Sequence, residues 1–550
     1  MLKIINGQVY DPANGIKGEI RNICLAGGKI VADAAEFAAR NEQVQIIDAA
    51  GCVVMPGGVD IHAHVAGTKV NSGRIMCPED HYDHFRSRTA VARAGSGYTV
   101  PSTFLTGYNY ALLGYTTVFE AAVPPLEARH AHEELQDIPL LDNGFYTLMG
   151  NNYMIMKILS DTDAVRRRER LRETVAWLLR STRGYAVKVV NPGGVESWKW
   201  NKGSVNLDTP TPPFGVTPRQ IIQGLAAAAE ELKLPHPLHL HANHLGEPGN
   251  YVTTLDTMRA LEGRRTHFTH LQFHAYGQGK SGGFTSAAAE IAAYLNTHPE
   301  FTCDVGQIVF GPATTMTSDA PMQFRLHQVT GNKWGSSDVE MESGSGIVPL
   351  LYRPQVLANA VQWAVGLELL LLVNNPWQIF LTTDHPNAGP FVAYPDIIQL
   401  LMDAGYRRSR LAELHARTTR VTQLQDIDRE YTLDEIAVIT RAGTARALGL
   451  KHKGHLGVGA DADIAVYRQR HNIRDMFAQP DYVIKEGKIA VHKGEIMASF
   501  DGKTLVAGPA GEQKLPADLA AIFAGYYSVA AANFAVEAEY VPRPEVIACG

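Results

Sequence analysis

One apolar segment that carries two alternating histidines constrains this fold more than any other feature. It reads Met55-Pro-Gly-Gly-Val-Asp-Ile-His-Ala-His64. Side chains two residues apart on a β-strand point to the same side, so His62 and His64 converge on one point. Two imidazoles at this spacing can hold a metal ion if the fold brings further ligands from elsewhere. The segment therefore predicts a strand that contributes part of a metal site.

Four further candidate ligands lie at or near the ends of short apolar segments. They are Lys188, His241, His270 and Asp384. A parallel α/β barrel places its chemistry at the C-terminal ends of its strands. The separations between the candidates also suit βα units. We therefore expect a (β/α)8 TIM-like barrel with a site for metal at one end.

Lys188 lies inside the apolar run Tyr185-Ala-Val-Lys-Val-Val190. An ammonium group buried in a strand is costly unless it is paired or changes its chemistry. Desolvation lowers the pKa of a lysine, and the neutral amine can react with carbon dioxide. The carboxylated side chain could then bridge two metal ions. The alternative is a lysine ion-paired inside the barrel, and Asp384 could likewise cap a turn instead of binding metal.

The chain divides into four predicted parts. Residues 1–56 form short strands separated by Gly- and Asn-containing turns, and strand-like segments return in residues 446–507, including 503–506. These two parts predict one small composite β-domain beside the barrel of residues 57–445. Residues 508–550 form a C-terminal extension that either contacts a partner or packs on its own barrel.

Several segments of the barrel read as helices. They are residues 166–181, a helix that begins at Thr217 and Pro218, residues 287–295 and residues 434–448. Thr217 is a good N-cap and Pro218 suits the first turn. Residues 67–110 and about 311–350 are too long for minimal barrel connections, and we expect them to form a pocket or lid.

Composition excludes several classes of protein. Lys plus Arg number 50 and Asp plus Glu 56, so the net charge of −6 argues against nucleic-acid binding. Five scattered cysteines without a C-x-x-C motif indicate a reducing, cytoplasmic compartment. The N-terminus lacks the pattern of a signal peptide. The most apolar segment, residues 364–373, is too short to span a membrane and predicts a buried helix.

The ordered ligands, together with Gly443-Thr-Ala-Arg-Ala-Leu-Gly-Leu450 and the following residues 454–466, resemble the amidohydrolase superfamily over roughly residues 1–500. The resemblance implies a metal-dependent hydrolase with two divalent ions, for which zinc is expected. It also implies that His62, His64 and Asp384 hold the inner metal and that His241 and His270 hold the outer one. Carboxylated Lys188 would bridge the two ions. Other divalent ions suit the same ligands.

Four segments carry a narrower resemblance. They are Met76-Cys-Pro-Glu-Asp-His81 and residues 239–250, 269–277 and 382–389. They are similar to the A-type chain of formylmethanofuran dehydrogenase and to its counterpart, the alpha chain of the bacterial formyltransferase/hydrolase complex, of which we favour the second. The resemblance implies hydrolysis of an N-formyl group on a methanofuran-type furfurylamine carrier to formate and free amine. It also implies partner subunits, including a formyltransferase.

In that reaction Asp384 would take a proton from the attacking water and pass it to the departing amine. His239 is the alternative to His241 as a ligand, because both have the parity to face inward. We expect His239, Asn243, His244, Gln272, His274 and His81 to line the pocket or to hold the ligands in place, with a structural role as the alternative. Lys69, Arg74, Lys199 and Lys202 could meet an acidic carrier tail or lie in solvent.

Two other functions fit parts of the sequence. A cyclic-amide hydrolase, similar to dihydroorotase or hydantoinase, would use the same metals with a different pocket. A non-catalytic scaffold would have kept the barrel and lost its chemistry. The presence of every expected ligand type argues against the scaffold.

Overall fold

Eight parallel strands form the centre of the molecule. The computed structural model describes residues 1–32, 44–82, 84–203, 205–280, 282–336, 346–511 and 514–550. In spatial order the eight strands are β6 (Gly58–Ala63), β9 (Tyr115–Val123), β10 (Asp142–Leu148), β11 (Ala186–Val190), β12 (Leu238–His241), β13 (Thr266–Phe268), β16 (Phe301–Asp304) and β20 (Ile379–Phe380). A parallel bridge between Ala63 and His385, just beyond β20, closes the circle. The predicted (β/α)8 barrel is confirmed.

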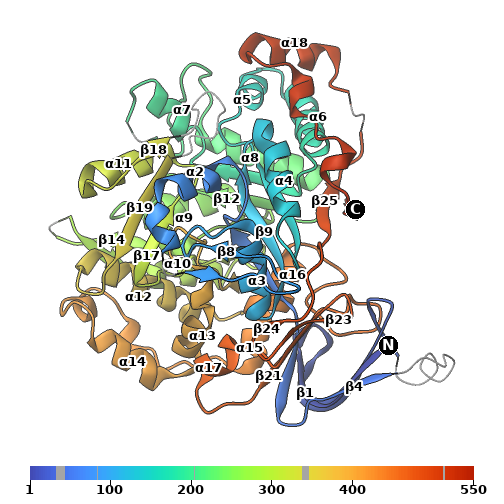
Figure 1. The fold of residues 1–550 in the computed structure, drawn as a ribbon. Helices are drawn as coiled ribbons and strands as arrows, with labels where there is room; N and C mark the ends of the chain where they lie inside the picture. Colours follow the sequence, from blue (N-terminus) through green and yellow to red (C-terminus); the bar gives the residue numbers. More distant parts are fainter. Residues whose placement is uncertain (33–43, 83, 204, 281, 337–345, 512–513) are drawn as a thin grey trace.

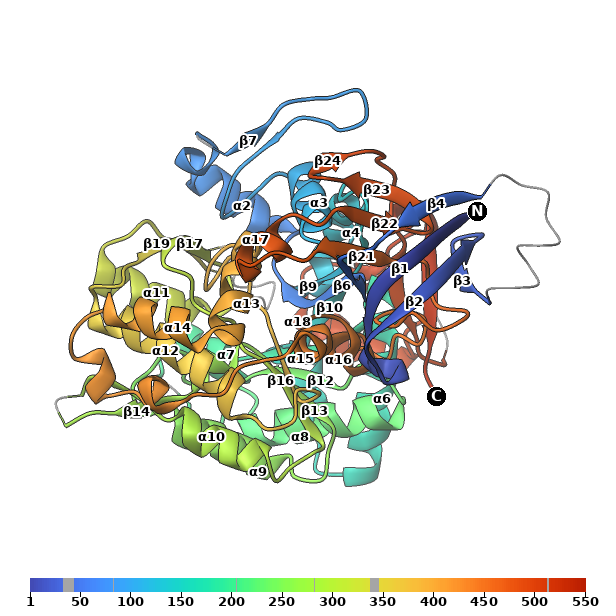
Figure 2. The ribbon, with the colours of Figure 1, turned by 90° about the horizontal axis from the view of Figure 1, so that it is seen from below.

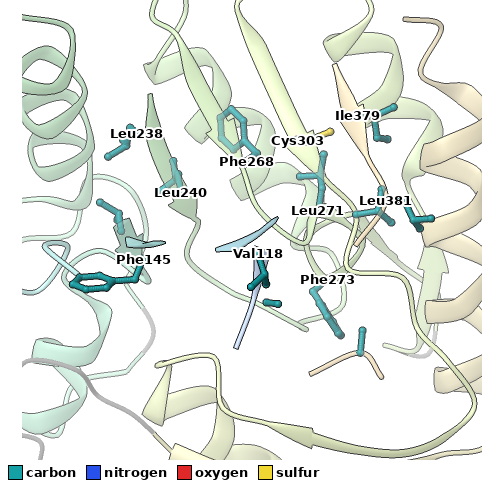
Figure 3. Close-up of a cluster of buried hydrophobic side chains, with 14 of the residues drawn as sticks. Val118, Phe145, Leu238, Leu240, Phe268, Leu271, Phe273, Cys303, Ile379 and Leu381 are labelled. Carbon is teal, nitrogen blue, oxygen red and sulfur yellow. The ribbon is translucent and has the colours of Figure 1, made fainter. Parts of the chain in front are cut away.

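Successive side chains of β12 point alternately to the covering helices and to the barrel interior. Leu238 and Leu240 belong to the main apolar core, together with Ile221 of the covering helix. Figure 3 shows both leucines on the strand, with Phe268 on the neighbouring strand β13. His239 and His241 have the opposite parity and face the barrel interior. The strands therefore bury leucines against the helices and histidines inside.

Helices follow the strands and cover the barrel (Figure 1). The main ones are α3 (Thr103–Leu112), α4 (Ala128–Gln136), α6 (Ala164–Thr182), α8 (Pro218–Glu231), α9 (Tyr251–Ala260), α10 (Ala288–Leu295), α12 (Leu357–Leu372) and α13 (Tyr394–Met402). Thr217 caps α8 in a capping box with Gln220, as its sequence predicts. The segment expected as one helix at 434–448 divides into α15 (Leu433–Ala437), a π-helical turn (Val438–Ala442) and α16 (Gly443–Ala447).

A second sheet joins the two ends of the sequence. Its strands are β1 (Leu2–Asp11), β2 (Ile16–Ala26), β3 (Lys29–Val31), β4 (Gln45–Asp48), β5 (Cys52–Pro56), β21 (Ile464–Arg468), β22 (Tyr482–Lys485), β23 (Lys488–His492) and β24 (Glu495–Ile496). β21 pairs with β5, so the C-terminal strands continue the N-terminal sheet. This is the composite β-domain that the sequence predicts (Figure 2).

The placement of residues 503–506 in the β-domain is wrong. Strand β25 (Thr504–Gly508) pairs with barrel strand β10, and β26 (Pro544–Ala548) pairs with β25. Its apolar pattern predicted a strand correctly, but such a pattern does not specify which edge the strand joins. The other predicted domain boundaries stay predictions.

The C-terminal extension packs on its own barrel. α18 (Ala517–Tyr526) contacts α5 (Tyr153–Leu159), and Phe523 and Phe534 lie against Trp177 of α6. Among the described helices, none alone is long and apolar enough to cross a membrane. Residues Ala517–Tyr526 and Ala531–Tyr540, bent by 91°, pass that test together by length and composition only. A contact between the extension and a partner stays a prediction.

Both long connections carry structure of their own. Residues 67–110 contain α2 (Thr68–Met76) and the hairpin of β7 (Phe85–Arg86) and β8 (Gly95–Ser96), which projects from the body in Figure 2. The second connection contains β17 (Gly311–Thr315), α11 (Ala320–Thr330), β18 (Gly335–Ser336) and β19 (Gly346–Tyr352). Residues 337–345 of this connection lie outside the described residues.

A buried ion network ties the barrel to the β-domain. Lys485 Nζ lies 2.6 Å from Asp142 Oδ2 on β10 and 2.8 Å from Asp463 Oδ2. Lys453 contacts the same two carboxylates and Asp461. Burial raises the pKa of Asp142, but the two lysines outweigh it and hold that pKa well below its usual value. Two ammonium groups occupy the space among these carboxylates, so the cluster is an ion network rather than a cation site.

Asp142→Asn should lower the free energy of unfolding by about 3 kcal/mol, because it leaves Lys485 buried with one carboxylate fewer. Chemical denaturation measures this loss. Asp208→Asn is the matched control: Asp208 is 67% exposed in its pair with Arg219, and the change should cost less than about 1 kcal/mol. Equal effects of the two substitutions would contradict a structural role for the network.

Candidate metal centre

The structure brings the six predicted ligands together at the C-terminal mouth of the barrel. His62 and Lys188 lie on β6 and β11, and His241 ends β12. His64, His270 and Asp384 follow the ends of their strands. All six side chains are buried. Residues from five different strands therefore converge, as the fold predicts.

The ligand atoms of these side chains have no hydrogen-bond partner among the described residues. The unpartnered atoms are His62 Nε2, His64 Nε2, Lys188 Nζ, His241 Nε2, and Nδ1 and Nε2 of His270. Buried polar atoms are normally satisfied, so several orphaned atoms at one site call for an explanation. Imidazole nitrogens and carboxylates are suitable ligands for divalent transition metals. The residues present therefore fit a metal centre.

One group has the spacing of ligands around a single ion. His62 Nε2 lies 3.0 Å from Asp384 Oδ1, and His64 Nε2 lies 3.3 Å from the same oxygen. His62, His64 and Asp384 form one of the clusters that could hold a cation. Burial raises the pKa of Asp384, but the nearby His62 and His64 outweigh it and lower that pKa to about 2. Asp384 is therefore ionised at neutral pH and available to a metal or a proton.

The second group lies beside the first. The ring centroids of His62 and His270 are 5.3 Å apart, and those of His270 and His241 are 4.7 Å apart. Burial lowers the pKa of Lys188 to about 7, although Asp304 and Asp384 oppose this effect. A large share of the Lys188 side chains is thus neutral near pH 7, the form that reacts with carbon dioxide.

Two buried carboxylates that the sequence analysis did not select support the histidines. Asp304 Oδ2 lies 3.2 Å from His62 Nδ1, and its Oδ1 accepts a hydrogen bond from the backbone N–H of His270. Glu120 Oε1 lies 3.1 Å from His64 Nδ1 and 2.9 Å from Lys69 Nζ. Asp304 lies close to the His62 ring and holds the backbone of His270. Glu120 is hydrogen-bonded to the His64 nitrogen opposite the metal side, as carboxylates behind histidine ligands commonly are. Lys69 is therefore committed to Glu120 and is not available to a carrier tail.

A chain of three histidines explains why His239 differs from His241. The carbonyl of Ala447 can only accept, so His236 donates from Nδ1 over 2.8 Å. His236 Nε2 then accepts from His239 Nδ1, and His239 Nε2 accepts from His62 Nδ1, each at 2.9 Å. Both nitrogens of His239 are thus used, and Nε2 of His62 is left with a lone pair. This geometry favours His241 as the ligand.

The remaining residues predicted to line the pocket or support the ligands differ in their surroundings. His274 is buried with both ring nitrogens unpartnered within the described structure, and its ring lies 5.3 Å from that of His241. Asn243 donates to Asn191, and Gln272 contacts Tyr276, so both are structurally engaged. His244 lines the cavity described next. His81 lies in a 3-10 helix (Pro78–His81) and not among the cavity-lining residues.

A cavity of about 650 Å³ opens above the centre. Asp384 and Asn387 line it, and its apolar lining includes Trp198, Phe273 and Tyr352. Asp319 also lines it and lies 3.2 Å from His241 Nε2 through Oδ2. Of the four basic candidates for an acidic tail, only Lys202 is among the lining residues. The cavity is large enough for a small organic molecule that reaches Asp384.

The backbone turns sharply where the ligands lie. His270 has a φ of 34° and Asp384 a φ of 46°, values in the left-handed region that non-glycine residues rarely adopt. Gly306 approaches so closely that a Cβ on it would lie 2.6 Å from His270 Cβ. Strained residues of this kind gather at functional sites.

The barrel, the composite β-domain and the candidate metal ligands together have the arrangement of a hydrolase of the amidohydrolase type. The chain belongs to the amidohydrolase family, because residues 45–491 match the sequence pattern of that family. Protein FwdA of Methanocaldococcus jannaschii is 46% identical over 99% of this chain and 98% of its own length. The FhcA chain of the formyltransferase/hydrolase complex Fhc of Methylorubrum extorquens is 41% identical over 94% of this chain and 93% of its own.

A solved structure matches the whole chain. It is the crystal structure of the formyltransferase/hydrolase complex FhcABCD from Methylorubrum extorquens in complex with methylofuran. The match covers 100% of both chains at 39% identity with a TM-score of 0.92. The predicted resemblance to this group of proteins is confirmed.

Two matched substitutions test the ligand assignment. His241→Asn should lose one metal ion per chain, because it removes an orphaned ligand atom. His239→Asn should retain both ions, with affinity lowered by about 10–100-fold through the loss of support for His62. Elemental analysis of dialysed protein measures the metal content. Loss of an ion from the His239 variant alone would reverse the assignment.

Proposed function

We propose that this protein hydrolyses an N-formyl group on a methanofuran-type furfurylamine carrier and releases formate and the free amine. One observation carries the proposal. Asp384 lies beside the buried, unpartnered nitrogens and lines a large cavity, in a chain that matches over its full length part of a complex crystallised with methylofuran. The reaction adds one water across the C–N amide bond, so it needs no redox cofactor.

His62, His64 and Asp384 would hold the inner of two divalent ions, with zinc as the expected metal. His241 and His270 would hold the outer ion, and carboxylated Lys188 would bridge the two. Such ions, when bound, lower the pKa of water and polarise a carbonyl oxygen. The orphaned nitrogens and the lowered pKa of Lys188 support this assignment.

Asp384 would move the proton. Its pKa of about 2 makes it a carboxylate at neutral pH, so it can accept a proton from the attacking water. Asn387 Nδ2 donates to Asp384 Oδ1 over 2.8 Å and holds the carboxylate in place. Asp384 would then give the proton to the amide nitrogen as the C–N bond breaks, because an unprotonated amine leaves poorly.

The cavity would orient the carrier. Trp198, Phe273 and Tyr352 offer aromatic surface for a furan ring. Lys202 and Arg325 lie on the lining and could meet an acidic tail, although Arg325 already pairs with Glu247. His274 and Asn243 would support the ligands or the bound carrier.

We also propose that the chain works with other subunits, including a formyltransferase that passes it the formylated carrier. The full-length similarity to the FhcA chain supports this assembly. A cytoplasmic location is proposed with it. All five cysteines lie in described residues and none forms a disulfide, which agrees with a reducing compartment.

Asp384→Asn should lower formate release from an N-formylated furfurylamine carrier by at least about 100-fold, because the amide cannot accept the proton. Release is measured on the protein purified with its co-purifying partners. Metal content is measured in the same samples, since a variant that has lost its metals would fail for another reason. Asp208→Asn, at an exposed residue that is not among those lining the cavity, is the control and should keep wild-type activity.

Wild-type protein that carries two metals and its partners but releases no formate would contradict the proposal. Hydrolysis of a dihydropyrimidine by that preparation would instead support a cyclic-amide hydrolase. Inactivity of the metal-loaded preparation on both substrates would favour a scaffold.

A further inference from the structure

Asp319 is a buried carboxylate beside the outer group of ligands that no part of the proposed mechanism uses. It lies between β17 and α11 and is 1% exposed. Its Oδ2 is 3.2 Å from His241 Nε2. The residue also lines the cavity, so its carboxylate faces the space in which the outer metal and the substrate would lie.

The contact between Asp319 and His241 resembles the contacts that Asp384 makes with His62 and His64 in the inner group of ligands. His241 Nε2 has no hydrogen-bond partner in the described part of the chain, although Oδ2 is so close. His62 Nε2 and His64 Nε2 likewise have none, although Asp384 Oδ1 lies within 3.3 Å of both. A nitrogen and an oxygen that are close but not aligned as donor and acceptor can both point at a third position, which is how ligands of one ion are arranged.

An asparagine anchors each carboxylate, through a different oxygen relative to the histidines. Asn387 Nδ2 donates over 2.8 Å to Asp384 Oδ1, the oxygen that also lies beside His62 and His64. Asn191 Nδ2 donates over 3.0 Å to Asp319 Oδ1, the oxygen turned away from His241. Oδ1 of Asp319 further accepts from Met322 N at the start of α11. These bonds occupy Oδ1 and leave Oδ2 directed toward His241.

Thr317, on the same loop, contacts the other nitrogen of His241. Its Oγ1 lies 3.3 Å from His241 Nδ1 and can accept the proton there. His241 Nε2 then carries a lone pair toward Oδ2. The loop 317–319 thus approaches both sides of one imidazole, from a connection that is separate from the barrel strands.

We propose that Asp319 is a ligand of the outer metal through Oδ2, the counterpart of Asp384 at the inner one. This inference rests on the metal centre of the proposed function. It adds a third carboxylate to Asp384 and carboxylated Lys188, which helps to balance the charge of two dications. It also ties α11 and the cavity wall to the metal, because Asp319 begins that helix.

The test is titration of metal-free, full-length protein with Zn²⁺ alone, followed by calorimetry and elemental analysis. Wild type should bind two ions, and Asp319→Asn should bind one with unchanged affinity and the second at least about tenfold more weakly. Asn caps helices as well as Asp does, so α11 should persist. Asp403→Asn is the matched control: Asp403 caps α14 (Ala404–Ala412) by accepting from Tyr406 N, and this variant should bind as wild type does.

Thermal unfolding of the metal-free proteins separates ligation from stability. Equal unfolding temperatures of the wild type and the Asp319 variant, with a weakened second ion, support the proposal. Two ions bound with wild-type affinities by the variant would overturn it, and so would a wild type that binds no second ion. Weakened binding in the variant together with no formate release by wild type would keep Asp319 as a ligand and reject only the formyl substrate.

Discussion

The main constraint on this structure is the free-energy cost of burying ligand atoms that have no hydrogen-bond partner. Nitrogens of four histidines and of Lys188 lie inside the barrel mouth without a hydrogen-bond partner in the described structure. Each such atom costs free energy when it leaves water. Asp384, Asp304 and Glu120 add buried negative charge around them. Bound cations would offset both costs together, and this constraint explains the histidine chain, the anchored carboxylates and the strained turns.

The two ends of the barrel have different roles: one holds a stabilising ion network and the other holds the candidate metal ligands. Around Asp142 the ion network with Lys453 and Lys485 joins the N-terminal ends of the strands to the β-domain. At the opposite end, Asp384 and Asp304 face histidine nitrogens, and Glu120 faces both His64 and the ammonium group of Lys69. The hydrogen-bond chain from Ala447 through His236 and His239 connects the interior to His62. The protonation of a ligand at the mouth is therefore set partly by the backbone carbonyl of Ala447, at the other end of this chain.

Much of the fold and the gathering of the ligands could be predicted because each signal is local. His62 and His64 show their parity on a strand, and Lys188 is conspicuous in an apolar run. The same reasoning could have found Glu120 and Asp304, which also lie in apolar strands, although single carboxylates are easily taken for turn residues. Asp319 gives no such signal, because only the tertiary fold brings its loop to His241. A strand at 503–506 was predicted, but the pairing of the observed β25 with β10 depends on an edge that periodicity does not reveal.

Anomalous diffraction at the zinc edge, from crystals of the protein grown with zinc, is the decisive test of the two-metal centre. We predict two peaks at the C-terminal mouth, one among His62, His64 and Asp384 and one beside His241 and His270. Density for a carboxylated Lys188 should lie between them. Absence of a peak at the mouth, with the orphaned nitrogens bonded instead to water or to one another, would contradict the metal centre.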